Sequence, residues 1–197
     1  MIKLINNNAN RKFCFAVFFL FLPLIWLVGC TKADSEYKEI ERQAKGGDIT
    51  KQIKLAEMYY KGEGVTQDYT KAFEWYSKAA AQGNSDAQVN LGDMYYTGDG
   101  VAKDYTKAFE WFTKAAEQNN ADAQFRIALM YSRGEGVPQD YVYALKWLYL
   151  AKSNTNDSEE MERISVYIPP LELKCTPEQI AKAQKLAAEF KPKQSGK

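Results

Sequence analysis

The sequence predicts an all-α fold, an α/α solenoid of three helix pairs with helical caps at both ends. The first observation is a 36-residue period, in which block 84–119 shares 20 of its 36 residues with block 48–83 and 14 with block 120–155. The second is the helical spacing of apolar residues in both halves of each block. The third is a double-glycine turn between these halves. Such a period is typical of stacked repeats, because one helix pair cannot cover its apolar face alone.

The first 29 residues have the features of an export signal. Lys3, Arg11 and Lys12 form a positive region, and an apolar run of 16 residues from Phe13 to Val28 follows. This run is shorter than the roughly 20 residues of a membrane-spanning helix. We therefore predict a cleaved signal peptide at 1–29, with an uncleaved membrane anchor as the alternative. Both place the remainder of the chain outside the cytoplasm and on a membrane.

Residues 30–34 are predicted to form a short tether and residues 35–47 an N-terminal capping helix. The helix carries Tyr37, Ile40 and Ala44 on one stripe and is polar elsewhere. A polar outer face is what the terminal repeat of a solenoid requires.

Each of the three blocks, 48–83, 84–119 and 120–155, is interpreted as two helices joined by the turn Gly-x-Gly-Val-x-x-Asp. The first glycine suits the left-handed conformation that ends a helix, and the aspartate suits the N-cap of the next one. Trp111 is expected to lie buried between stacked helices. The predicted left-handed glycines and N-caps are Gly62, Gly98 and Gly134, then Asp48, Asn84 and Asn120 for the first helices, and Asp68, Asp104 and Asp140 for the second helices.

Residues 156–191 are predicted to form C-terminal capping helices, followed by a tail at 192–197. Apolar residues from Glu159 to Ile168 have helical spacing, and Pro169 and Pro170 are expected to stop that helix. A last helix should begin after Thr176, whose hydroxyl and the amide of Gln179 can form a capping box.

The repeat motifs resemble Sel1-like repeats, which are related to tetratricopeptide repeats. The resemblance covers residues 48–151 and is carried by the 36-residue period, the L-G/A-x-M-Y motif, the G-x-G-V-x-x-D turn and the A-x-x-W-x-x-x-A helix. It implies an α/α solenoid used for protein–protein interaction, without naming a partner. The stretch T-P-E-Q-I-x-x-A-Q-x-L also resembles the end of many bacterial Sel1-like proteins.

The sequence Leu27-Val28-Gly29-Cys30 resembles a bacterial lipoprotein signal. The resemblance implies that Cys30 becomes the first residue of the mature chain and carries acyl chains such as palmitate, which would hold the protein to the membrane. Because Thr31 is not aspartate, similarity to Gram-negative sorting implies the outer membrane, facing the periplasm.

The composition disfavours catalysis and nucleic-acid binding. The chain has no histidine, and after removal of Cys14 and lipidation of Cys30 only Cys175 is left, so we expect no metal, no cofactor and no enzyme activity. The formal charge of +1 gives no field for nucleic acid. Cysteine-rich Sel1-like relatives suggest a β-lactam-binding or hydrolysing envelope enzyme as an alternative, although this chain lacks their cysteine pairs.

The predicted binding surface is the concave face, which by analogy with tetratricopeptide repeats is lined by the first helix of each pair. Most side chains on this face differ between repeats, whereas the residues of the structural framework recur in each repeat. Random sequence drift on a solvated face would give the same pattern. Tyr60, Tyr96 and Phe125 are the expected aromatic anchors. The acids Glu63, Asp99 and Glu135 are expected to be solvated turn residues. The predicted partner-binding residues are Lys54, Glu57, Tyr60, Val89, Asn90, Asp93, Tyr96, Phe125, Arg126 and Leu129.

Together these features predict a lipid-anchored adaptor for an unidentified protein partner in the bacterial envelope. A surface-exposed factor that contacts host proteins is a further alternative, since it would have the same chemistry and a different partner.

Overall fold

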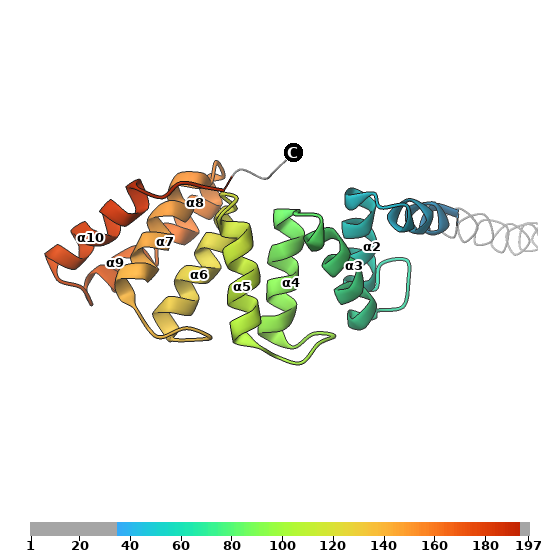
Figure 1. Ribbon diagram of the computed structural model, residues 1–197, viewed down its shortest axis with the longest axis horizontal. Coiled ribbons are helices and arrows are strands. Elements are labelled where there is room, and N and C mark those ends of the chain that lie inside the picture. Colours follow the sequence, from blue (N-terminus) through green and yellow to red (C-terminus); the bar gives the residue numbers. More distant parts are fainter. Residues whose placement is uncertain (1–34, 194–197) are drawn as a thin grey trace, which may run out of the picture.

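A computed structural model describes residues 35–193 of the chain. Within this range the residues are helical or in turns, and the helices follow one another in pairs along the long axis of the molecule (Figure 1). A helix at 35–45 comes first. The others are α2 (Ile49–Lys61), α3 (Tyr69–Ala81), α4 (Ser85–Thr97), α5 (Tyr105–Ala116), α6 (Ala121–Arg133), α7 (Tyr141–Asn154), α8 (Ser158–Ser165), α9 (Ile168–Glu172) and α10 (Pro177–Ala188).

The helix boundaries follow the predicted caps. The side chain of Asn84 accepts a hydrogen bond from the Ala87 amide at 2.9 Å, and that of Asp104 accepts one from the Lys107 amide at 3.0 Å. Gly98 ends α4 in the left-handed region, with φ of 90°. The equivalent residues of the other two repeats have the same roles, so the predicted start of every repeat helix and the predicted end of each first helix are confirmed.

In the second and third turns, the second glycine is required by a close approach between repeats, whereas a Cβ atom on Gly64 of the first turn would meet only Met58 at 3.5 Å. A Cβ atom on Gly100 would overlap the backbone carbonyl of Tyr69, and one on Gly136 would overlap that of Tyr105. Both glycines also have positive φ. The turn of one repeat is therefore packed on the first residue of the second helix in the preceding repeat.

Small residues let the two helices of one repeat approach closely. Gly92 faces the ring of Phe112, which is only 1% exposed and would lie 2.6 Å from a Cβ atom at position 92. The prediction for Trp111 needs correction, because this residue is only partly buried, with the Lys114 ammonium 3.8 Å from its ring centroid. Its equivalent Trp147 is buried, with the ring of Phe190 against it at 5.5 Å.

A buried glutamine joins each repeat to the one before it. Gln88 donates from its amide to the carbonyl of Ala80 at 3.3 Å and accepts from Gln118 at 2.8 Å. Gln52 and Gln124 make the same bonds one repeat earlier and one repeat later, with Gln82 and Asn154 as their donors. Since buried polar groups cost free energy unless they are paired, these bonds fix how consecutive repeats stack.

The C-terminal cap contains three helices, α8, α9 and α10. The expectation that Pro169 and Pro170 stop a helix is wrong: α8 ends at Ser165, and the prolines lie in the first turn of α9. Proline is tolerated there because the first amides of a helix have no intrahelical acceptor. The predicted capping box of Thr176 and Gln179 is confirmed.

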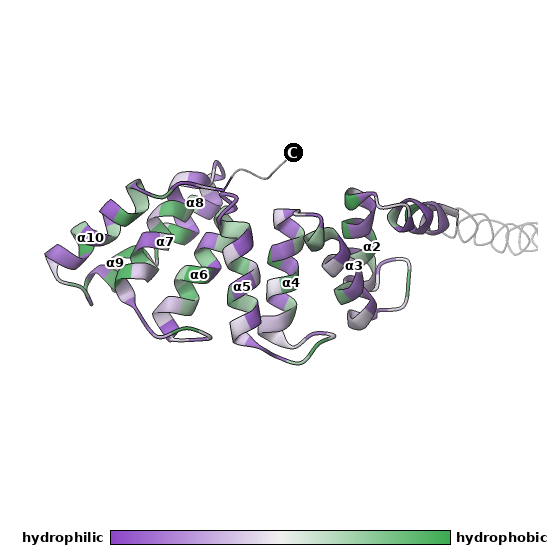
Figure 2. Ribbon diagram, in the orientation of Figure 1, coloured by the Kyte–Doolittle hydropathy of each residue, from purple (hydrophilic) through white to green (hydrophobic). Residues whose placement is uncertain are grey.

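The helix at 35–45 is mostly hydrophilic, as Figure 2 shows, whereas α10 alternates hydrophilic and hydrophobic residues. Beyond α10 the chain returns along the solenoid, and the Lys193 ammonium pairs with Glu117 at 2.8 Å. Among the described helices, none is both long and apolar enough to span a bilayer.

Candidate interaction surface

The predicted binding residues lie on the first helices of the three pairs. We define the A-helix face as Lys54, Glu57 and Tyr60 of α2, Asn90, Asp93 and Tyr96 of α4, and Arg126, Leu129 and Arg133 of α6. Lys54 and Arg133 are exposed, and the other seven are partly buried. The ion pair between Arg126 and Asp93, at 2.8 Å, links α6 directly to α4 across this face.

Val89 and Phe125 do not belong to this face, although the sequence analysis placed them there. Each is only 6% exposed. Phe125 contacts the ring of Tyr167 at 5.1 Å, and the guanidinium of Arg163 lies 4.9 Å from its ring centroid. The C-terminal cap therefore covers Phe125, so it is part of the core and not an exposed anchor.

Tyr60 and Tyr96 fasten consecutive repeats together. The Tyr60 hydroxyl donates to Asp99 at 3.0 Å, and the Tyr96 hydroxyl donates to Glu135 at 2.7 Å. Burial, reinforced by the Asp99 carboxylate, raises the pKa of Tyr60 to about 12. Asp99 and Glu135 are thus hydrogen-bond acceptors between repeats, which corrects the expectation that they are merely solvated.

An ion-pair network crosses the A-helix face toward the C-terminal cap. Arg126 pairs with Asp93 at 2.8 Å and with Asp122 at 3.4 Å, and Arg163 reaches Asp122 at 3.6 Å. Burial raises the pKa of the Asp93 carboxyl to about 6; Asp122 contributes to this rise, whereas Arg126 opposes it.

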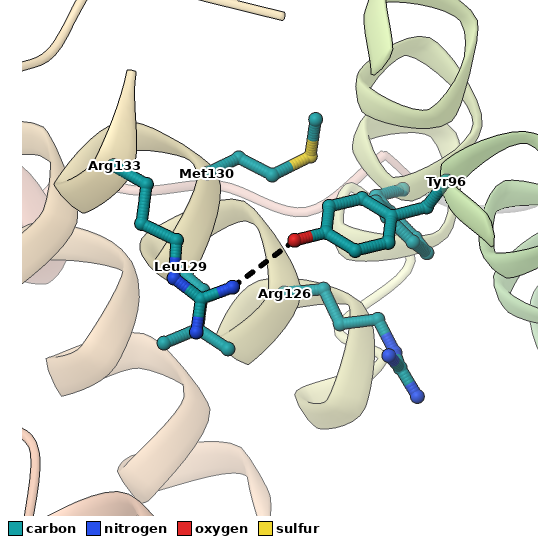
Figure 3. Close-up of a pocket in the computed structure, with 6 residues that line it drawn as sticks. Tyr96, Arg126, Leu129, Met130 and Arg133 are labelled. Carbon is teal, nitrogen blue, oxygen red and sulfur yellow. Dashed lines mark hydrogen bonds between the residues drawn. The ribbon is translucent and has the colours of Figure 1, made fainter. Parts of the chain in front are cut away.

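Three predicted residues converge on one hollow of about 120 Å³, which we call the arginine hollow. Tyr96, Arg126 and Leu129 line it together with Phe112, Met130 and Arg133. In Figure 3 the Tyr96 hydroxyl points toward the Arg133 guanidinium, whereas the Arg126 guanidinium extends away from it. Arg133 donates to the Tyr96 hydroxyl at 3.0 Å. The hollow therefore combines apolar walls with a positioned cation.

A second hollow of about 280 Å³, the apolar hollow, adjoins the arginine hollow, because Leu129 and Arg133 line both spaces. Its remaining walls come mainly from apolar residues of α6, α7 and the α8–α9 junction, including Leu148, Tyr167 and Leu171. Tyr167 remains 40% exposed, so its ring is accessible at the rim.

Comparison with known proteins identifies the repeat. The family model described as the Sel1 repeat matches residues 52–84, 85–120 and 121–156. The chain belongs to the Sel1-repeat family. Sel1-repeat proteins generally serve as protein–protein interaction modules, and the fold is mainly an interaction scaffold.

Solved structures support this assignment. A Sel1-repeat protein from Oxalobacter formigenes is 32% identical with a TM-score of 0.58, over 67% of this chain and 98% of that one. A protective antigen of uropathogenic Escherichia coli strains with an SLR fold is 29% identical with a TM-score of 0.58, over 78% of this chain and 40% of that one. Helicobacter pylori cysteine-rich protein B shares the fold at 23% identity and a TM-score of 0.51, over 64% and 96% of the two chains. No curated protein matches the chain.

Other predicted residues of this Sel1-repeat protein lie away from the two hollows or outside the described range. Lys54 lines a separate hollow of about 180 Å³ with Tyr37 and Met58. Asn90 turns back on its own helix, where its amide donates to the Asp86 carbonyl at 3.0 Å. Cys30 and the signal at 1–29 lie outside the described residues. Within 35–193, no three cysteine or acidic side chains converge as a metal site requires.

The sequence analysis missed Arg133 and Phe112. Arg133 stands where the other repeats have Lys61 and Thr97, a position at the end of the first helix that looks like an ordinary solvated site. Only the packing of Tyr96 across the repeat boundary brings the Arg133 guanidinium into a defined place. Phe112 lies in the core, and its ring also forms a wall of the arginine hollow.

Proposed function

We propose that this Sel1-repeat protein is a membrane-anchored adaptor of the bacterial cell envelope, which captures a partner protein on its A-helix face. The observation that supports it best is the arginine hollow, because three residues selected for their variation between repeats meet there. Leu129 stands where the other repeats have Glu57 and Asp93. An apolar side chain thus replaces an acid at a residue that lines both hollows, and this change distinguishes the third repeat where we propose that the partner binds.

The anchor is supported by the sequence of residues 1–30 alone. The charged region, the short apolar run and the Leu27–Cys30 motif are together typical of bacterial lipoproteins. Acylation of Cys30 would give stable membrane attachment, since each buried methylene contributes about 0.8 kcal/mol. We place the folded repeats at the outer membrane, on the periplasmic side.

Capture through the A-helix face can be tested with a matched pair of double variants. Arg126→Gln with Leu129→Gln removes one cation and one apolar side chain from the face. We expect recovery of crosslinked partner from the envelope to fall about ten-fold or more, as it does when interface anchors are truncated. Recovery would be measured by quantitative mass spectrometry with the full-length anchored protein as bait.

The control is Leu173→Gln with Lys182→Gln, which removes the same chemistry from exposed positions of the C-terminal cap. It should recover the partner as the wild type does. If the control loses the partner and the A-helix variant keeps it, the cap is the binding surface and our proposal is wrong.

A further inference from the structure

Arg133 has an unused hydrogen-bonding edge beside the arginine hollow. Its Nη1 atom donates to the Tyr96 hydroxyl at 3.0 Å and lies 3.7 Å from Glu135. Among the described residues, no acceptor engages its Nε and Nη2 atoms. These two atoms form the side edge of the guanidinium, whose parallel N–H groups match the two oxygens of a carboxylate.

The arginine is held in place before any ligand binds. The Tyr96 hydroxyl accepts from Arg133 and donates to Glu135 at 2.7 Å, and the ring of Tyr96 packs against Tyr105 at 5.0 Å. A side chain that is already oriented loses less conformational entropy on binding. Half of the Arg133 side chain is exposed, so a ligand can reach it.

The neighbouring apolar hollow indicates which second group a ligand would carry beside a carboxylate bound to Arg133. It shares Leu129 and Arg133 with the arginine hollow and is also lined by Leu148, Tyr167 and Leu171. Because the two hollows adjoin, one extended chain that occupies both would place a carboxylate side chain at the first and a large apolar side chain at the second.

We propose that Arg133 and Tyr96 form a subsite for an acidic residue of an extended partner segment, which places an aspartate or glutamate carboxylate on the free edge of Arg133 and a neighbouring large apolar side chain in the apolar hollow. This inference rests on the proposed function, in which the A-helix face captures a protein. It adds the chemistry that the partner must present. Tyr96 is a positioning residue, since it acts by orienting Arg133.

The test uses acetylated and amidated peptides, so that their ends carry no charge. Each has a Gly-Ser frame with one glutamate and one leucine, separated by one, two or three residues. Matched peptides have glutamine for glutamate or serine for leucine. Fluorescence anisotropy with the full-length protein in mild detergent gives each Kd. We expect at least one spacing to bind, and both matched peptides to bind at least ten-fold more weakly.

Variants of the protein then locate the site. Arg133→Gln should weaken binding of the glutamate peptide about ten-fold and leave the glutamine peptide unchanged. Arg133→Lys retains the charge but not the forked edge, so it should weaken binding of the glutamate peptide less than Arg133→Gln does. Tyr96→Phe should also weaken this binding less than Arg133→Gln does. The control is Arg42→Gln, since Arg42 is likewise exposed and paired with a single acid, Glu39. It should bind as the wild type does.

The proposal is overturned if no peptide binds, if Arg133→Gln binds the glutamate peptide normally, or if the glutamine peptide binds equally well. It is also overturned if a glutamine peptide with a free C-terminal carboxylate replaces the glutamate peptide, because the carboxylate source would then be a chain end. Failure of the adaptor function looks different. In that case the envelope pull-down shows no dependence on Arg126 and Leu129, whatever the peptides do.

Discussion

Asp93 has a charge that depends on the fold, because burial raises the pKa of its carboxyl from an ordinary 3.8 to about 6. Between about pH 4 and pH 6, Asp93 is therefore protonated in the folded chain and ionised in the unfolded chain. The contribution of Asp93 to folding stability must then decrease as the pH rises through this range. Above it, Asp93 is ionised and paired with Arg126 at 2.8 Å.

We expect Asp93→Asn to remove this pH dependence. Between pH 4 and pH 7, the free energy of unfolding of the wild type should fall relative to the variant by about 1–2 kcal/mol, a pKa shift of about two units discounted for partial exposure. Urea titrations at both pH values measure the difference. In the wild type, the Asp93 carboxyl carbon should titrate near pH 6 by NMR; a midpoint near 4 would contradict the assignment.

At the scale of the element, a comparison of two glycines can distinguish the cost of backbone strain from the cost of steric overlap. Gly83 and Gly100 both have positive φ, of 89° and 71°. A Cβ atom on Gly83 would meet nothing within 4 Å, whereas one on Gly100 would meet the backbone of Tyr69 in the preceding repeat. Alanine at either position should be strained, but only alanine at position 100 should push two repeats apart.

We therefore expect Gly83→Ala to lower the free energy of unfolding by about 1–2 kcal/mol, the cost of a left-handed alanine. Gly100→Ala should cost a further 1–3 kcal/mol or so, because the neighbouring backbone must move. Chemical denaturation of both variants provides the comparison. Equal losses would mean that the turn relaxes freely and does not hold the repeats together.

At the scale of the whole molecule, the proposed lipid anchor would decide where the solenoid acts. Cys30→Ala should abolish incorporation of labelled palmitate and leave an unprocessed precursor, because the acyl chains require the thiol. Labelling followed by electrophoresis measures both effects. Cys14→Ala is the matched control and should be acylated normally. Palmitate in the Cys30 variant would exclude lipidation at this residue.

Much of the fold could be predicted because the local signals for helix starts and ends recur in each 36-residue repeat. Caps such as Asn84 and Asp104, and the left-handed Gly98, depend only on neighbouring residues, so the sequence alone identified them. The errors arose at contacts between distant segments. Phe125 was taken for an exposed anchor because its repeat position is not a framework position, yet the cap brings Tyr167 and Arg163 onto it. Arg133 was missed because only Tyr96, 37 residues away, gives it a defined position.

The buried glutamines have a consequence for how this protein can change in length. Gln52, Gln88 and Gln124 each donate to a backbone carbonyl of the segment that precedes their repeat, and each accepts from a side chain near the end of its own repeat. An internal duplication of residues 84–119 would therefore insert a copy that carries its own donor, Gln118, and whose glutamine meets a carbonyl of the repeat before it, so no buried amide would lose its partners. The solenoid can lengthen by whole repeats in a single genetic step, and each added repeat supplies another first helix whose surface is free to diverge.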